Sequence, residues 1–115
     1  QVLEMSRTLI LTQKEIILRL GDVVETRSHE TGNHVLRVSE YASLLGTLAG
    51  RNREEADDLK VASPMHDVGK IGISDLVLNT PGKLTDDEFI LLQQHTVMGS
   101  HIFPKSSLPV LQLAA

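Results

Sequence analysis

The residues best suited to chemistry lie in the segment VASPMHDVGKIGISD, residues 61–75. His66 and Asp67 stand side by side where an apolar, helix-like run ends, and Lys70 follows three residues later. Neighbours on a helix point ~100° apart, so an imidazole and a carboxylate share one ion easily only where the helix bends or ends. Pro64 predicts such a bend. Taken alone, the segment leaves three possibilities open: a metal site, a solvated surface pair, or a packing detail.

Other side chains could join this site. Glu30 and His34 lie four residues apart at an expected helix start, and His95 precedes Gly99 by one turn. Glu and His at this spacing are usually solvated, and His95 falls near the apolar face of its helix and could be structural. Lys70 could simply suit the dipole at a helix C-terminus. Together, however, acids and imidazoles from several helices are how helical bundles build carboxylate–histidine metal sites.

Composition limits the function classes. The 115 residues suffice for one domain, and 41% hydrophobic with 23% charged residues indicates a globular chain. The net charge of −4 gives no general attraction for nucleic acid or an anionic membrane. Without cysteine, disulfides and thiolate sites are excluded, so a metal must use His, Asp or Glu, ligands that suit Fe, Mn, Zn or Mg.

The chain shows no targeting or membrane signal. No apolar run approaches the ~20 residues that span a bilayer, and the start lacks a signal-peptide pattern. The first residue is Gln rather than Met. We therefore expect a cytoplasmic protein without a membrane partner, seen here as a piece of a longer polypeptide.

The apolar spacing predicts an all-α fold. Asn52 is expected to cap one helix, and Thr85 with Glu88 forms a capping box for another. Thr31 is a further expected cap. The expected helices cover residues 2–24, about 31–49, 52–65 and 85–102, with a fifth beginning at 109, and residues 69–84 are expected to form a loop with a turn at Pro81-Gly82.

The first helix carries an apolar stripe. Its members are Val2, Met5, Leu9, Ile16 and Val23, with Ile10, Ile17, Leu20 and Val24 beside them. Thr12 and Arg19 interrupt the stripe. The pattern leaves two possibilities open: a dimerising coiled coil, or a helix that packs against its own domain.

Three blocks carry a family resemblance: ETGNHVLRVSEYA, then ASPMHDVGKIGISDLVLNTPGKLT, then a helix with HTVMG. From about Glu25 onwards, the chain resembles the HD-GYP family of metal-dependent phosphohydrolases. The resemblance implies a partial HD-domain helical bundle at 27–115, after a linker or signalling helix at 1–26. It also implies hydrolysis of cyclic di-GMP in bacterial signalling.

The resemblance further implies roles for individual residues. Asp67 and Lys70 match catalytic positions, and the metal ligands match Glu30, His34, His66, Asp67 and His95. The implied cofactor is a centre of two or three metal ions, iron or manganese, with zinc, magnesium and nickel as alternatives. The implied partners are cyclic di-GMP, an upstream receiver or sensor domain as in two-component response regulators, and a second copy in a homodimer, but no nucleic acid polymer. His29 and His101 match no ligand.

The family's naming motif, a His-His-Glu followed by an Asp-Gly-x-Gly-Tyr-Pro loop, is expected just after residue 115. These 115 residues therefore hold an incomplete ligand set, and we expect them alone to bind metal weakly and to be inactive. Two alternatives stay open: another HD-type phosphohydrolase acting on nucleotides or phosphate esters, or a non-catalytic signal-relay module.

Overall fold

The computed structural model describes residues 1–28, 32–103, 106 and 108–115. Every regular element in these ranges is helical, which confirms the all-α prediction. In chain order the elements are α1 (Val2–Arg27), α2 (Gly32–Leu48), α3 (Arg53–Ala62), the 3₁₀ turns η1 (Ser63–Met65) and η2 (Val68–Gly72), α4 (Asp75–Leu78), α5 (Asp86–Ser100) and α6 (Pro109–Ala114).

Helix starts follow the predicted caps. The Asn52 side chain accepts a hydrogen bond from the backbone N–H of Glu55 at 2.9 Å. At α5, Thr85 and Glu88 form the reciprocal capping box, with both hydrogen bonds at 3.2 Å. The predicted cap at Thr31 lies outside the described residues. Where these polar side chains are present, local sequence therefore fixes where a helix begins.

The segment after His66 differs from the predicted loop. Residues 68–72 form η2, in which the N–H of Lys70 donates to the carbonyl of Asp67 at 2.9 Å. Ser74 then caps α4 through a hydrogen bond from Leu76 N–H at 3.3 Å. The prediction of a loop was wrong here because single helical turns are too short to show a period. Gly82 has a φ of 84°, as the predicted Pro-Gly turn requires.

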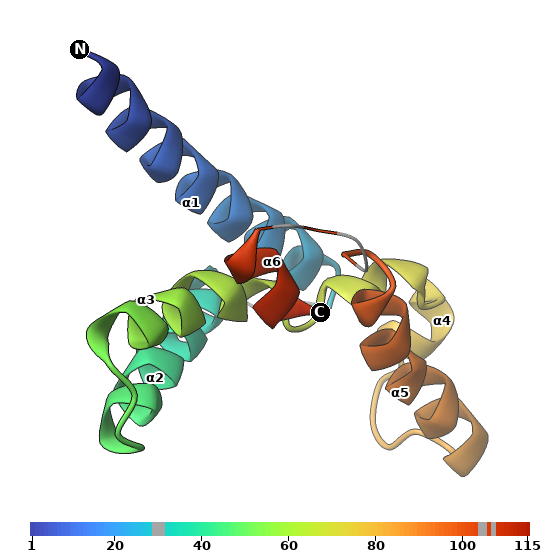
Figure 1. Ribbon diagram of the computed structural model, residues 1–115. Helices are drawn as coiled ribbons and strands as arrows, with labels where there is room; N and C mark the ends of the chain where they lie inside the picture. Colours follow the sequence, from blue (N-terminus) through green and yellow to red (C-terminus); the bar gives the residue numbers. More distant parts are fainter. Residues whose placement is uncertain (29–31, 104–105, 107) are drawn as a thin grey trace.

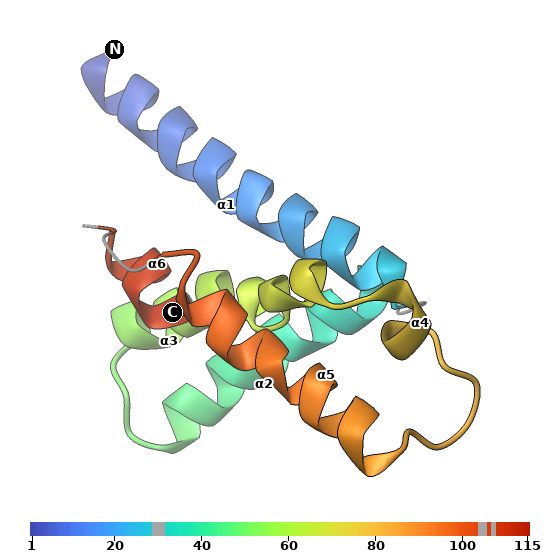
Figure 2. The same ribbon diagram turned by 90° about the vertical axis from the view of Figure 1, so that its right-hand side faces the viewer.

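The helices form two groups beside the end of α1. Helices α2 and α3 lie side by side, and α5 crosses η2 (Figures 1 and 2). The first half of α1 projects away from all the other elements in both views. A small apolar core joins the groups where the second half of α1 meets the turns after α3; its buried members are Ile17, Val24, Met65 and Val68. This junction positions the residues around His66 and Asp67.

Two glycines allow close crossings at this junction. A Cβ on Gly69 would lie 2.6 Å from the backbone nitrogen of Gly99, and closer still to the carbonyl oxygen of His95. A Cβ on Gly21 of α1 would lie 2.7 Å from the carbonyl oxygen of Pro64. Gly99 faces Gly69 across this crossing, and a Cβ on Gly99 would lie 3.3 Å from the backbone nitrogen of Gly69. These contacts set the distance of α5 and α1 from the His66-Asp67 turn.

No helix in the described ranges combines the length and the apolar composition needed to cross a membrane.

Candidate metal centre

Asp67 lies at the centre of the candidate site. Its Oδ2 atom is 3.0 Å from Nε2 of His66 and 2.9 Å from Nζ of Lys70. Its Oδ1 atom is 3.1 Å from Nε2 of His95. His66 and Asp67 directly follow η1, Lys70 lies in η2, and His95 comes from α5. One carboxylate thus joins side chains from segments far apart in the sequence.

The two imidazole rings are held in the same way. Nδ1 of His66 lies 2.7 Å from the carbonyl oxygen of Ser63. Nδ1 of His95 lies 2.7 Å from the carbonyl oxygen of Leu92. Because a carbonyl oxygen only accepts, each Nδ1 must donate its hydrogen. In the neutral ring, Nε2 then carries a lone pair that faces the Asp67 carboxylate. These lone pairs repel unless a proton or a metal ion lies between them.

The electrostatics of the group favour bound positive charge. Burial alone raises the pKa of Asp67, but hydrogen bonds from His66, Lys70 and Glu25 outweigh burial and hold this pKa well below its usual range. The hydrogen bond to Asp67 raises the pKa of His66 above 6.5, although burial opposes the change. An ionised acid therefore attracts a cation to the nitrogen beside it.

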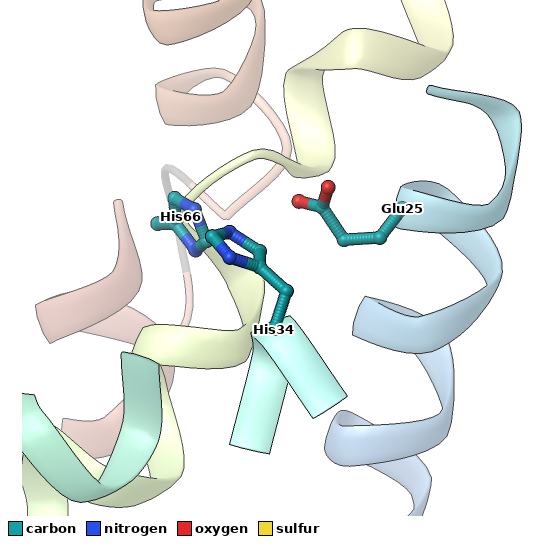
Figure 3. A group of neighbouring side chains, drawn as sticks. All are labelled: Glu25, His34 and His66. Atoms are coloured by element: carbon teal, nitrogen blue, oxygen red, sulfur yellow. The ribbon is translucent and has the colours of Figure 1, made fainter. Parts of the chain in front are cut away.

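A second group of possible ligands adjoins the first. Glu25, His34 and His66 each offer one ligand atom, and these atoms all lie within 4.8 Å of one another. Figure 3 shows the Glu25 carboxylate, from α1, directed toward the two imidazoles, which come from α2 and from the turn after α3. The ring centroids of His34 and His66 are 6.1 Å apart. Two ligand atoms at ~2.1 Å from one ion span at most about 4.2 Å. Small side-chain rotations would therefore bring the three onto one ion.

Glu25 is the functional candidate that the sequence analysis missed. Its side chain is 1% exposed, and Oε1 has no hydrogen-bond partner in the described part of the chain. Burial raises its pKa, and the nearby Asp67 carboxyl adds to the rise, while Lys70, whose Nζ is 3.7 Å from Oε2, opposes it. A buried carboxylate oxygen without a partner is costly unless it meets a cation. The sequence gives only a weak signal for this residue: Glu25 directly follows Val24, an apolar position of the first helix.

Arg27 fixes the lysine-bearing turn to α1. Its guanidinium donates to the carbonyl oxygens of Lys70 and Ile73, both at 3.0 Å. It also pairs with the Asp75 carboxylate at 2.7 Å. The last turn of α1 thus places Glu25 in the site and holds η2 against it.

Comparison with known proteins identifies the architecture. The HD domain family matches residues 31–114, which includes His34 and the whole group around Asp67. The chain belongs to the HD domain family. The family resemblance expected from the sequence is confirmed.

Similar proteins with assigned activities are bacterial phosphodiesterases. A 3'3'-cGAMP-specific phosphodiesterase 2 of Vibrio cholerae is 45% identical over 103 residues, covering 90% of this chain and 20% of the relative. A cyclic di-GMP phosphodiesterase of Thermotoga maritima is 38% identical, covering 88% and 27%. The cyclic di-GMP phosphodiesterase response regulator RpfG of Xanthomonas campestris is 35% identical, covering 90% and 27%. This HD domain chain therefore spans between a fifth and about a quarter of these relatives' length.

The structure brings most of the predicted site residues together. The described ones are His34, His66, Asp67, Lys70 and His95, and all lie in the two adjoining groups. Glu30, the remaining predicted ligand, lies outside the described residues. His101, which matches no ligand of the family, is exposed at the end of α5.

The donor set of this HD domain fits a metal cofactor. Imidazole nitrogens and carboxylate oxygens are ligands that Fe, Mn, Zn and Ni accept. The carbonyl oxygens behind both rings provide the outer hydrogen bonds typical of ligating histidines. The buried Oε1 of Glu25 supplies the orphaned polar atom that a cation would satisfy. HD domains depend on metals, and the observed cluster agrees with that dependence.

Proposed function

We propose that this chain is the metal-holding part of a cyclic-dinucleotide phosphodiesterase that hydrolyses cyclic di-GMP in bacterial signalling. The observation that carries the proposal is that the Nε2 lone pairs of His66 and His95 both face the ionised Asp67 carboxylate, because this arrangement creates a cation site. The assigned activities of the similar Vibrio and Thermotoga proteins support the choice of substrate.

We assign His34, His66, Asp67 and His95 as ligands, together with Glu30 from the family pattern. His66 belongs to both groups of ligand atoms, which supports a centre of at least two ions. We propose iron or manganese, the metals that the family resemblance implies, and the imidazole and carboxylate ligands suit both.

The chain's own residues orient and charge the site. A bound metal centre would lower the pKa of a water molecule and polarise the scissile phosphate. Asp67 orients the rings of His66 and His95, and the carbonyl contacts behind the rings stop them from turning. Lys70 holds its ammonium 2.9 Å from Asp67, where a positive charge can stabilise the developing negative charge on a phosphate.

A second substrate, 3'3'-cGAMP, is favoured by a specific observation. The relative named for that substrate is 45% identical to this chain, whereas the Thermotoga cyclic di-GMP enzyme is 38% identical. The two dinucleotides differ in one base, so the phosphodiester chemistry is the same for both. Parallel assays with both substrates distinguish them.

A chimaera tests the proposed activity. The matching 103-residue segment of the Vibrio cholerae phosphodiesterase 2 is replaced by residues of this chain. We expect the chimaera to release linear dinucleotide or mononucleotide, and the same chimaera with Asp67→Asn to lose activity by about 10²-fold or more. A folded, metal-loaded chimaera that cleaves neither substrate would contradict the proposal.

The same assay separates the two alternative functions. Cleavage of simple phosphate esters or mononucleotides without cleavage of cyclic dinucleotides would indicate another HD-type phosphohydrolase. Full metal loading without cleavage of any substrate would indicate a signal-relay module.

We also propose a domain organisation and partners for the chain. We assign residues 1–26 to a linker helix and 27–115 to the HD-GYP-like part. The response-regulator name of the Xanthomonas relative supports an upstream receiver or sensor domain. A cytoplasmic location and a homodimer remain predictions.

A further inference from the structure

Helix α1 carries an exposed apolar row with a seven-residue repeat. Val2, Leu9, Ile16 and Val23 recur at intervals of seven residues, and Met5 stands three residues after Val2. All five are large apolar side chains exposed by 53–79%. Such a repeat is the seam of a left-handed coiled coil, in which these four residues take the a positions.

The seam lies on a different side of α1 from the packed face. The helix buries Ile17, Gly21, Val24 and Glu25 against its own domain. At ~100° per residue, these point about a third of a turn away from the seam. The seam residues therefore remain exposed while the other face of α1 packs against its own domain and places Glu25 at the candidate metal centre. All of the first twelve residues are exposed, so no other described element covers the first half of α1 (Figures 1 and 2).

Two shallow depressions follow the same seam. One is lined by Thr12, Glu15, Ile16, Arg19, Leu20 and Val23. The other is lined by Gln1, Glu4, Met5, Thr8 and Leu9. Each is a hollow between successive turns of one helix, which is where a coiled-coil partner inserts its side chains.

We propose that this seam binds α1 of a second copy of the chain, in parallel and in register. A second copy matches the seam because an identical helix presents the same seven-residue repeat. Three of the four a positions hold a β-branched residue, Val2, Ile16 or Val23, which favours a two-stranded, parallel pair. The d positions hold Met5, Thr12 and Arg19 in place of the preferred leucine, so the seam is weaker than an ideal one. In that arrangement each a residue meets its own equivalent in the partner helix.

Arg19 sets the strength of this interface. It occupies a d position, where leucine is preferred, and so meets the partner's Arg19 across the seam. The positive charge of its guanidinium is partly compensated by two carboxylates of its own helix. The guanidinium nitrogens lie 3.6 Å from Oε1 of Glu15 and 3.8 Å from Oδ2 of Asp22. The arginine therefore weakens the pair without abolishing it.

The buried area agrees with a weak dimer. The apolar seam residues, including Leu20, are exposed by 48–79%. At roughly 60–120 Å² for each fully buried side chain, two copies together would bury on the order of 700 Å² of apolar surface. Aliphatic parts of flanking side chains bring the total near the ~1,000 Å² lower limit of specific interfaces. Interfaces of this size are typical of weak, transient association.

Single cysteines test the arrangement, because the chain has none of its own. Ile16→Cys places two thiols opposite each other only in a parallel, in-register pair, since a disulfide requires Cα atoms within about 7 Å. Arg7→Cys, on the opposite side of the helix, is the matched control. Under mild oxidation we expect Ile16→Cys to cross-link at least about tenfold more than the control. Equal cross-linking of both variants, or none, would overturn the proposal.

Sedimentation equilibrium supplies an independent measurement. Arg19→Leu should lower the dissociation constant of the dimer by about tenfold or more, and Ile16→Lys should raise it by a similar factor. Both side chains are exposed, so the helical circular dichroism of each monomer should stay unchanged. A monomer at all concentrations in both the natural chain and Arg19→Leu would contradict a second copy as the partner. Neither readout depends on phosphodiesterase activity.

Discussion

The hydrogen positions on two histidines decide what the site can bind. Carbonyl oxygens behind His66 and His95 hold both Nδ1 hydrogens, so each neutral ring directs its Nε2 lone pair at Asp67. A proton and a metal ion therefore compete for the same nitrogen. The hydrogen bond that the protonated His66 ring donates to Asp67 raises the pKa of His66, which favours the proton in the metal-free protein.

Metal affinity should consequently depend on pH. Protonated His66 cannot act as a ligand, so the affinity for Mn²⁺ should fall as the pH drops through the raised pKa of His66, a decline that begins above pH 6.5. Isothermal titration of Mn²⁺ between about pH 8 and 6, in two buffers of different ionisation enthalpy, should also show proton release on binding. An affinity that is constant over this range, without proton release, would contradict the competition.

Glu25→Gln should separate stability from metal binding. Burial raises the pKa of Glu25, so its charged form opposes folding once the pH exceeds the ordinary value of 4.5. The metal-free variant should therefore unfold a few degrees higher than the natural chain at pH 7, since ~1 kcal/mol corresponds to ~4–8 °C in a small domain. The difference should shrink toward pH 4. Thermal unfolding in EDTA measures it.

The same variant should bind Mn²⁺ less tightly, because an amide oxygen carries no charge. A lower melting temperature together with unchanged Mn²⁺ affinity would show that Glu25 has only a structural role.

Sequence alone predicted the site residues that stand in local patterns. His66, Asp67 and Lys70 are neighbours along the chain, and His95 precedes a glycine by one turn. Glu25 could not be found in this way, because its place in the site depends on how α1 packs against the turns after α3. That packing is a long-range property, and a charged residue on a helix is solvated in most proteins.

At the scale of elements, a glycine contact sets the distance between α5 and the lysine-bearing turn. Gly69 lies against the backbone of His95 and Gly99. Caps and periodicity predicted α5, whereas η2 was predicted as loop, since a 3₁₀ turn of a few residues has no repeat to read. The sequence therefore predicted α5, which carries His95, but not the turn that α5 crosses near Asp67.

Gly69→Ala should push α5 away from η2. The new methyl group would collide with backbone atoms that cannot rotate aside, which should cost about 1–3 kcal/mol of unfolding free energy and weaken Mn²⁺ binding. Gly46→Ala is the matched control, because its methyl group would meet chiefly the flexible tip of Leu59. Chemical denaturation and Mn²⁺ titration compare the two variants. Equal effects on Mn²⁺ binding would argue against a role of this crossing in the site.

At the scale of the whole molecule, the site joins four segments that are far apart in the sequence. Its side chains come from α1, α2, the turns after α3, and α5. The apolar core between them is small, so these elements depend on polar contacts at the site for part of their arrangement. The all-α class could be predicted from helical periodicity, but this convergence required the packing itself.

Metal should therefore stabilise the whole chain. A ligand at about 100 times its dissociation constant adds ~2.7 kcal/mol if it binds only the folded state, which corresponds to a rise of about 10 °C in melting temperature. Thermal unfolding with and without Mn²⁺ measures this rise. His34→Ala should lose most of it, and His101→Ala, outside the site, should keep it. Equal rises in both variants would place the bound metal elsewhere.

Equilibrium Mn²⁺ binding followed by electron paramagnetic resonance tests the central claim most directly, because the signal of free Mn²⁺ falls as the ion binds. The natural chain and His101→Ala should bind at least one ion with equal affinity. Asp67→Asn, which keeps the shape of the side chain and removes its charge, should bind about 10- to 100-fold more weakly. Equal binding by all three proteins, or binding by none, would contradict a metal centre at Asp67.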